Sequence, residues 1–301
     1  MTFNDQFRPM GAAAINGILV GANLVATRGV IGQTHPASLA LLRYTIGFCF
    51  LLPFALTSAR PSFDRRDLLP IAALGITQFG ILVTLLNYAV QFIPSAHASL
   101  LFATFPLLTM VLAAALGQER LTAAKSVGVA FTLAGVALAL GEKAFESGNT
   151  PNIWIGEAAV LLSAFSGALC SVLYRPYLRK YPTLPLSAFA MLASVLFLAV
   201  FAASEGFFVA FPMITATGWL AVGFIGLSSG VGYYLWLWAL NHTSATNVTV
   251  FLSLSPITAT LLGALLLGEN ISLMSILGVL FVAFGLWLAH RPDGRVLPAF
   301  R

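Results

Sequence analysis

Two stretches of this sequence match each other at a fixed distance along the chain. Residues 101–140 read LFATFPLLTMVLAAALGQERLTAAKSVGVAFTLAGVALAL, and residues 251–290 read FLSLSPITATLLGALLLGENISLMSILGVLFVAFGLWLAH. A shift of 150 positions aligns them without a gap, and it pairs Pro106 with Pro256, Glu119 with Glu269, Gly128 with Gly278, Phe131 with Phe281 and Gly135 with Gly285. Residues of such different types at matched places predict an internal repeat, because a repeated structural unit keeps its turn and packing residues in register.

The whole chain is as apolar as these two stretches. It has 301 residues, of which 59% are hydrophobic and 8% are charged, with a mean hydropathy of +0.92. An average soluble domain carries about 25% charged residues, so this composition excludes a soluble or disordered protein. About 20 apolar residues cross a bilayer as a helix. Ten runs of that length follow one another: 10–31, 36–57, 68–91, 95–116, 122–141, 153–174, 184–204, 218–240, 244–267 and 272–289.

The repeat and the charges together predict the topology. Each half holds five spans, an odd number, so the second half enters the membrane in the opposite orientation. Inverted repeats of this kind are typical of secondary transporters. If the N-terminus is cytoplasmic, 12 of the 15 Lys and Arg residues lie in inside segments, two lie outside, and Arg43 lies within a span. Because cytoplasmic loops collect Lys and Arg, we expect both termini to be cytoplasmic in a multi-pass protein of the inner membrane.

These features resemble a known family. Residues 86–89 (Leu-Asn-Tyr-Ala), Pro106 and residues 117–122 (Gly-Gln-Glu-Arg-Leu-Thr) are similar to the EamA-type repeat of the drug/metabolite transporter superfamily. Residues 236–240 (Trp-Leu-Trp-Ala-Leu), Pro256 and residues 267–269 (Leu-Gly-Glu) repeat the pattern, and Arg43 in LLRYTIG matches an Arg that the family often carries on its second helix. The resemblance covers essentially the whole chain. It departs from the family at 117–119, where Gly-Gln-Glu stands in place of the common Gly-Glu.

The resemblance implies a fold and a class of function. The fold would be an all-α integral membrane protein with ten transmembrane helices in two inverted five-helix repeats, residues 1–146 and 147–301, around a central cavity. The family places helices 1, 3, 4, 6, 8 and 9 around that cavity. Its substrates range from amino acids to other metabolites and drugs. We therefore expect a secondary transporter of small metabolites, amino acids above all, which exports them by alternating access.

Uncharged polar residues in the spans are the candidates for substrate binding, because polar groups in a bilayer need partners. Asn16 and Asn23 are seven positions apart and share a face of the first helix. Several other polar residues fall near the middle of their spans, where transporter sites are expected, and Tyr234 and Trp238 could stack on a substrate. The candidates are Asn16, Asn23, Gln78, Thr104, Ser163, Ser166, Ser228, Tyr234, Trp238 and Ser253. The alternative is structural: an Asn can join two helices, a Ser or Thr hydroxyl can bond its own helix backbone, and an aromatic ring can belong to the interfacial belt or the packing.

One matched pair is a candidate for gating and another for hinges. His97 and Asn247 are repeat partners, and inversion places them at opposite mouths of the cavity. Pro106 and Pro256 lie within spans, where each removes a helical N–H bond and frees the carbonyl of Phe102 or Leu252, which predicts matched kinks or hinges. The alternatives are ordinary interfacial polarity and static kinks.

Three charged residues are assigned structural or interfacial roles. Arg43 lies about seven residues into the second helix and can snorkel to the outer interface, although an anion contact or a lock between helices is the alternative. Glu119 and Glu269 close the matched motifs Gly-Gln-Glu and Gly-Glu.

Other classes of function find little support in the sequence. Residues 226–230 (Gly-Leu-Ser-Ser-Gly) match the GxSxG pattern of hydrolases, but the nucleophile elbow needs a strand–turn–helix context, and this match lies inside an apolar span. No P-loop, dinucleotide or metal motif occurs, so we expect no enzyme, cofactor, metal or nucleic-acid partner. The partners we expect are the lipid bilayer and a small-molecule substrate. An intramembrane enzyme, a channel and a non-catalytic assembly subunit stay open as alternatives, as does the oligomeric state. No Asp or Glu lies near the centre of a span, which favours facilitated diffusion or coupling through His97.

Overall fold

The computed structural model describes residues 3–57, 63–118, 126–135, 138, 152–268 and 273–289. Within these ranges the chain is helical and contains no strand. The elements are α1 (Phe3–Val30), η1 (Ile31–Gln33), α2 (Pro36–Thr57), α3 (Arg65–Gly75), η2 (Ile76–Ile81), α4 (Leu82–Phe92), α5 (Ser95–Phe102), α6 (Phe105–Ala115), a helix over 126–135, α8 (Ile153–Leu173), α9 (Arg175–Lys180), α10 (Thr183–Ser204), α11 (Ala216–His242), α12 (Ala245–Val250), η3 (Phe251–Leu254), α13 (Ser255–Leu267) and α14 (Leu273–Ala289).

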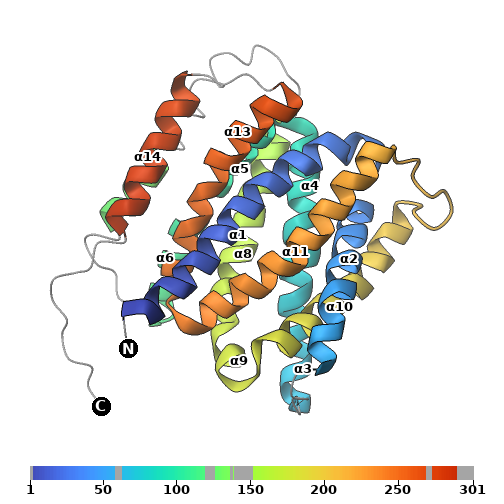
Figure 1. Ribbon diagram of the computed structural model, residues 1–301, viewed down its shortest axis with the longest axis horizontal. Coiled ribbons are helices and arrows are strands. Elements are labelled where there is room, and N and C mark those ends of the chain that lie inside the picture. The colour runs from blue at the N-terminus through green and yellow to red at the C-terminus, as the bar shows by residue number, and fades with distance from the viewer. Residues whose placement is uncertain are drawn as a thin grey trace.

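The all-α membrane fold predicted from the sequence is confirmed. Eight helical segments in the described part of the chain are long and apolar enough to cross a membrane. Two shorter apolar helices, Ser126–Gly135 and Ile276–Gly285, lie where the fifth and tenth spans are expected. The predicted boundary at 146/147, together with Glu119 and Glu269, lies outside the described residues. The helices form one bundle in which α1 begins and α14 ends on the same side (Figure 1).

Equivalent helices of the two halves make equivalent contacts with helices of the opposite half. α1 packs against α11 and α13, and its counterpart α8 packs against α4 and α6. α2 packs against α11, and its counterpart α10 packs against α3 and η2. The pair α2–α10 joins equivalent helices of the two halves, and the contact of α5 with α13 is matched by that of α12 with α6. These matched contacts are the packing expected of two repeats related by a two-fold axis.

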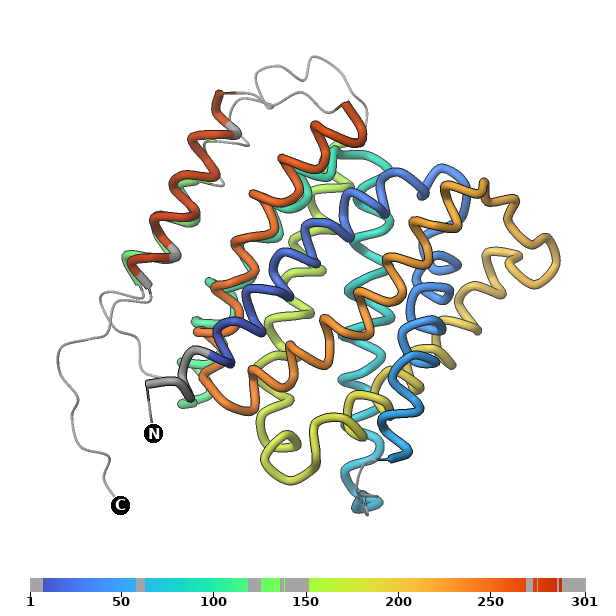
Figure 2. Tube along the Cα trace, in the orientation of Figure 1, coloured from blue at the N-terminus to red at the C-terminus, as the bar shows by residue number. Residues whose placement is uncertain are grey.

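A pair of glycine contacts shows the same relation in detail. The helix over 126–135 and α14 stand together at one side of the bundle (Figure 2). A Cβ atom placed on Gly135 would lie 2.5 Å from the carbonyl oxygen of Gly278, and one placed on Gly285 would collide with the carbonyl oxygen of Gly128. A shift of 150 positions converts the first contact into the second. The glycines that revealed the repeat in the sequence are therefore the residues that let these two helices touch.

The helices that contain the matched prolines are broken at equivalent places. The first stops at Phe102 and restarts at Phe105, while the second passes through the 3₁₀ segment η3 before α13. Pro106 and Pro256 each occupy the first turn of the second segment, where a missing N–H costs nothing. The carbonyl of Leu252, which we expected to be free, accepts the backbone N–H of Ser255. A 3₁₀ turn, rather than an open carbonyl, is thus how η3 accommodates its proline.

Polar contacts join the chain at both ends of the bundle. At one end the Glu205 carboxylate accepts the backbone N–H of Ser38 at 2.8 Å and its hydroxyl at 2.7 Å, and so caps the start of α2. At the other end Asp67 accepts hydrogen bonds from Lys180 at 2.7 Å and from the Tyr181 hydroxyl at 2.6 Å. Each contact ties the loop region of one half to a helix terminus of the other.

Candidate functional site: a cavity between the two repeats

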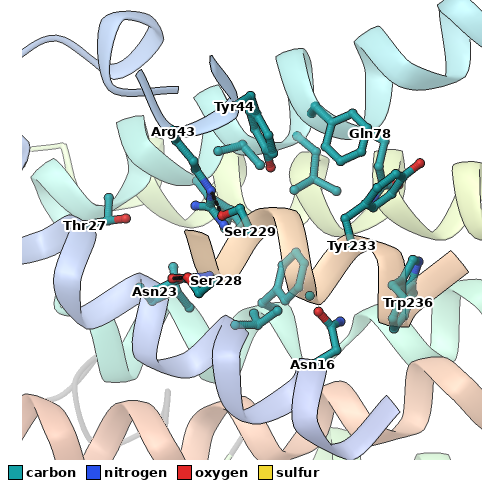
Figure 3. A pocket seen from close by; sticks show the side chains of 18 of the residues that line it. Asn16, Asn23, Thr27, Arg43, Tyr44, Gln78, Ser228, Ser229, Tyr233 and Trp236 are labelled. Atoms are coloured by element: carbon teal, nitrogen blue, oxygen red, sulfur yellow. Dashed lines mark hydrogen bonds between the residues drawn. The ribbon is translucent and has the colours of Figure 1, made fainter. Parts of the chain in front are cut away.

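A cavity of about 100 Å³ lies where helices of both halves meet. Its walls come from α1, α2, η2, α4, α5, α6, α11 and η3 (Figure 3). The lining residues are Asn16, Val20, Asn23, Leu24, Thr27, Arg43, Tyr44, Gln78, Phe79, Leu82, Val83, Leu86, Asn87, Phe102, Phe105, Ser228, Ser229, Gly232, Tyr233, Trp236 and Leu252.

One side of the cavity is polar and hydrogen-bonded. The Ser228 hydroxyl donates to Oδ1 of Asn23 at 2.6 Å, which joins α11 to α1. The next residue, Ser229, accepts Nε–H of Arg43 at 2.5 Å, which joins α11 to α2. Figure 3 shows these four side chains close together, with Thr27 on the same side. Two adjacent serines thus connect one helix of the second repeat to two helices of the first.

The other side of the cavity is aromatic. The Tyr44 and Phe79 rings lie 4.8 Å apart between centroids, and the Phe79 and Tyr233 rings lie 4.0 Å apart in an edge-to-face arrangement. Phe105 meets Trp236 at 6.0 Å, also edge to face. Aromatic pairs in this geometry stabilise each other beyond the area that they bury. The wall that they form suits an apolar or aromatic part of a ligand.

Gln78 reaches the cavity from a π-helical turn. The turn η2 interrupts the third span between α3 and α4, and π-turns of this kind are frequent at functional sites because they re-aim side chains. Just after this turn, the carbonyl of Leu82 accepts the Ser163 hydroxyl at 2.9 Å. The matching stretch of the second half, within α11, is regular α-helix. The two halves therefore differ at this point, although the sequence aligns Gly80 with Gly230.

Four of the ten predicted binding residues line the cavity and six do not. Asn16, Asn23, Gln78 and Ser228 are in its wall. Outside the wall lie Thr104, Ser163, Ser166, Tyr234, Trp238 and Ser253.

In three of the six residues the hydroxyl group is already used in a hydrogen bond to a backbone carbonyl. The Thr104 hydroxyl donates to the carbonyl of Leu101 at 2.8 Å, and the Ser166 hydroxyl donates to that of Leu162 at 2.9 Å. The Ser163 hydroxyl is used by the neighbouring helix, as described above. This is the structural alternative that a single hydroxyl in a span always offers. Trp238 contacts the ring of His242 at 4.3 Å instead of the cavity.

Arg43 lies where the sequence did not place it. We expected a structural side chain reaching the outer interface, and a cavity bounded by the sixth helix rather than the second. Instead Arg43 and Tyr44 of α2 are in the wall, and no residue of α8 is. The reason is the close approach of α2 to α11: a Cβ on Gly47 would lie 3.2 Å from the carbonyl oxygen of Gly226. This contact determines how α2 is rotated, and Arg43 turns inward beside Ser229.

The sequence analysis also missed the aromatic wall. Tyr44, Phe79, Phe105, Tyr233 and Trp236 were not among the candidates. The available signal was their position, since all of them except Trp236 lie beside or within about one turn of a polar residue in a span. In a chain with 24 Phe and 7 Tyr residues, that signal is weak.

The gating candidates lie at the ends of the bundle, outside the cavity wall. His97, at the start of α5, is buried and its Nε2 lies 3.1 Å from Oε1 of Glu157 on α8. Asn247, near the start of α12, donates from its side-chain amide to the Thr243 hydroxyl at 3.4 Å. α5 and α12 begin at opposite ends of the bundle (Figure 1).

The serine of the GxSxG match has no histidine as its partner. Ser228 donates to Asn23 and to the carbonyl of Ile225 within a continuous helix. Among the described residues no three His, Cys, Asp or Glu side chains are grouped to hold a metal ion.

Comparison with known proteins places the chain among membrane transporters. The EamA-like transporter family matches twice, over residues 9–141 and 154–291. The "Uncharacterized transporter YdfC" of Bacillus subtilis is 30% identical over 83% of this chain and 80% of that protein. The "Probable terminal-alkyne amino-acid exporter" of Streptantibioticus cattleyicolor is 30% identical over 85% and 84%. The "Uncharacterized inner membrane transporter YedA" of Escherichia coli is 28% identical over 96% and 92%. One crystal structure has the same fold, with a TM-score of 0.71 at 23% identity over 92% of this chain and 95% of that one.

Proposed function

Because the chain belongs to the EamA-like transporter family, we propose that it exports small metabolites of the amino-acid type across the inner membrane by alternating access. The observation that supports this proposal is the cavity between the two repeats. It combines hydrogen-bonding side chains on one side with aromatic rings on the other. A site of this kind at the repeat interface is where transporters bind substrate.

The chemistry of the walls supports an amino-acid type of substrate. An amino acid carries its amino and carboxylate groups at one end, which suit the hydrogen-bonding side of Asn23 and Ser228. An apolar side chain at its other end suits the aromatic side of Phe79 and Tyr233. The relative from Streptantibioticus is itself named as a probable amino-acid exporter. An enzyme is not part of the proposal, because Ser228 is held by an amide oxygen and the relatives are named as transporters.

Two measurements test this function. Metabolite profiling of cells with and without the protein identifies which compounds accumulate, and counterflow of those compounds in proteoliposomes tests transport directly. Ser228→Ala should raise KM several-fold, whereas Ser166→Ala serves as the matched control because its hydroxyl bonds only its own helix. Uptake that does not saturate would indicate a channel, and absence of transport together with a co-purifying partner would indicate an assembly subunit.

The proposed cycle is driven by the substrate gradient or is coupled through His97. No Asp or Glu is among the residues that line the cavity, so the site lacks a carboxylate to carry a proton. Liposomes that impose a substrate gradient or a pH gradient separately distinguish the two modes. Strict proton dependence that survives loss of His97 would contradict this part of the proposal.

The matched pairs act in the proposed cycle as gates and hinges. His97 and Asn247 gate opposite mouths, while the helix breaks at Pro106 and Pro256 let the halves rock. The contact between His97 and Glu157 supports a gate at one mouth, since it ties α5 to α8. If alanine at both His97 and Asn247 left the transport rate and its pH profile unchanged, the gates would be excluded.

Both termini are cytoplasmic in the proposed topology. The excess of Lys and Arg in one set of loops supports this orientation. Tags at the two ends should be protected in intact cells and become accessible after permeabilisation. A C-terminal tag that is accessible from outside would reverse the assignment.

A further inference from the structure

Arg43 is a charged side chain in the wall of a membrane cavity. Of the residues that line the cavity, it alone carries a formal charge. Arginine stays protonated in proteins, so the positive charge is permanent. A charge inside the bilayer is costly unless it is paired.

The described part of the chain supplies no carboxylate to pair with Arg43. The ion pairs found there join His97 with Glu157 and Lys180 with Asp64 and Asp67. The contacts of the Arg43 guanidinium are one hydrogen bond from Nε to Ser229 and an approach to the Tyr44 ring at 5.4 Å. Neither contact neutralises the charge.

The single hydrogen bond leaves the recognition edge of the guanidinium available. Arginine has five N–H donors, of which Nε provides one and the two terminal nitrogens provide four. Ser229 engages Nε, and its own hydroxyl donates to the carbonyl of Ile225 on the same helix. The guanidinium is therefore held from one side, and its terminal N–H groups can form the paired bonds that carboxylates accept.

Close packing between α2 and α11 also holds Arg43 in a fixed position. A Cβ on Gly226 would lie 2.6 Å from Cβ of Ile46 and 3.2 Å from the carbonyl oxygen of Arg43 itself. A Cβ on Gly230 would lie 3.0 Å from the carbonyl oxygen of Gly47. α2 and α11 thus touch backbone to backbone on both sides of the Arg43–Ser229 contact, which keeps the guanidinium directed at the cavity (Figure 3).

From this geometry we infer that Arg43 binds the carboxylate of the transported substrate, whose apolar body lies against the wall of Phe79, Tyr233 and Trp236. This assignment rests on the proposed transport function and specifies the chemistry of its substrate: an organic acid or amino acid with a large apolar group, oriented with its carboxylate toward α2. The substrate anion completes the pairing that the protein leaves open.

Counterflow of labelled L-phenylalanine into proteoliposomes containing the full chain tests the assignment. The competitors are 3-phenylpropionate, which lacks the amine, and L-phenylalaninamide, which lacks the carboxylate. Hydrogen bonds to charged groups contribute about 1.5–3 kcal/mol, so the acid should compete about 10- to 150-fold better than the amide. Arg43→Gln should bring that ratio close to one, and Arg43→Lys should restore part of it.

Control variants and competitors separate the outcomes. Ser166→Ala, outside the cavity wall, should keep the full preference, and Ser229→Ala should reduce it, since Ser229 holds the guanidinium. If Arg43→Gln does not fold, Arg43→Lys and the competitor series on the unaltered protein still decide. Equal competition by acid and amide, an unchanged ratio in folded Arg43→Gln, or inorganic phosphate competing as well as 3-phenylpropionate would overturn the carboxylate assignment while transport stands. No counterflow of L-phenylalanine or of any metabolite found by profiling would instead reject the proposed function.

Discussion

Replacing Gly226 by alanine should disturb both the packing and the site. The added Cβ would lie 2.6 Å from Cβ of Ile46, whereas carbon atoms pack at about 3.5–4.0 Å. α2 must therefore move about 1 Å away from α11. The bond between Arg43 Nε and Ser229 Oγ, now 2.5 Å, would lengthen to about 3.5 Å, the distance at which a hydrogen bond is effectively lost.

Gly223 offers a matched control on the same helix. A Cβ at Gly223 meets nothing within 4 Å. Both alanine variants gain the same helix propensity, up to about 1 kcal/mol, so the comparison isolates the steric cost at Gly226. Overpacking typically costs about 1–3 kcal/mol, which should lower the apparent Tm of Gly226→Ala relative to Gly223→Ala by on the order of 2–6 °C.

Two assays decide the Gly226 prediction. Thermal unfolding in detergent, followed as loss of the monodisperse fraction, measures the difference in apparent Tm. Counterflow in liposomes measures whether Gly226→Ala also weakens substrate binding, as a displaced Arg43 requires. Equal Tm values and equal KM values for the two variants would show that α2 and α11 are not in close contact at this level.

Three further substitutions follow from single contacts. Glu205→Ala removes the acceptor that caps α2 and should cost about 1–2 kcal/mol, seen as a lower apparent Tm; an unchanged Tm would argue against the cap. Ser163→Ala loses the inter-helix bond to Leu82 and should cost about 1 kcal/mol, while Ser166→Ala should be near neutral in the same melt, and the reverse order would be inconsistent with these contacts. Gly135→Ala places a Cβ 2.5 Å from a carbonyl oxygen of the opposite helix and should reduce the yield of folded protein in fluorescence-detected chromatography, unless the two helices are farther apart than described.

Sequence could predict the repeat because its signals are local. Pro106 and Pro256 start helix segments at equivalent places, and Gly135 and Gly285 lie at equivalent helix crossings. Each of these residues acts through its own backbone, which a helix break or a close crossing requires whatever lies around it. A one-dimensional shift of the sequence therefore finds them.

The cavity wall could be predicted only in part. The depth of a residue in the membrane does not determine whether its face of the helix is turned toward the cavity. Asn23 and Ser166 both fall near the middle of a span, yet Asn23 bonds Ser228 in the cavity wall and Ser166 bonds its own helix. Arg43 is the opposite case, since it was expected at the outer interface and lies in the cavity wall. Its inward orientation depends on glycines of another helix almost 200 positions away in the chain, and no pattern within the second span reports them.

The two halves share their helix breaks and glycine crossings but differ in the polar residues that they contribute to the cavity. The helix breaks and glycine crossings occur in both repeats, as the proposed rocking of the two halves about a two-fold axis requires. The polar side of the cavity is asymmetric: it takes Asn23 and Thr27 from α1, whereas the serines of the counterpart α8 bond backbone carbonyls. The π-helical turn at Gln78 has no counterpart in α11. Hydrogen-bonding groups therefore gather around Arg43 on one side of the axis, so a bound molecule has a preferred orientation in a frame that could otherwise accept it either way round.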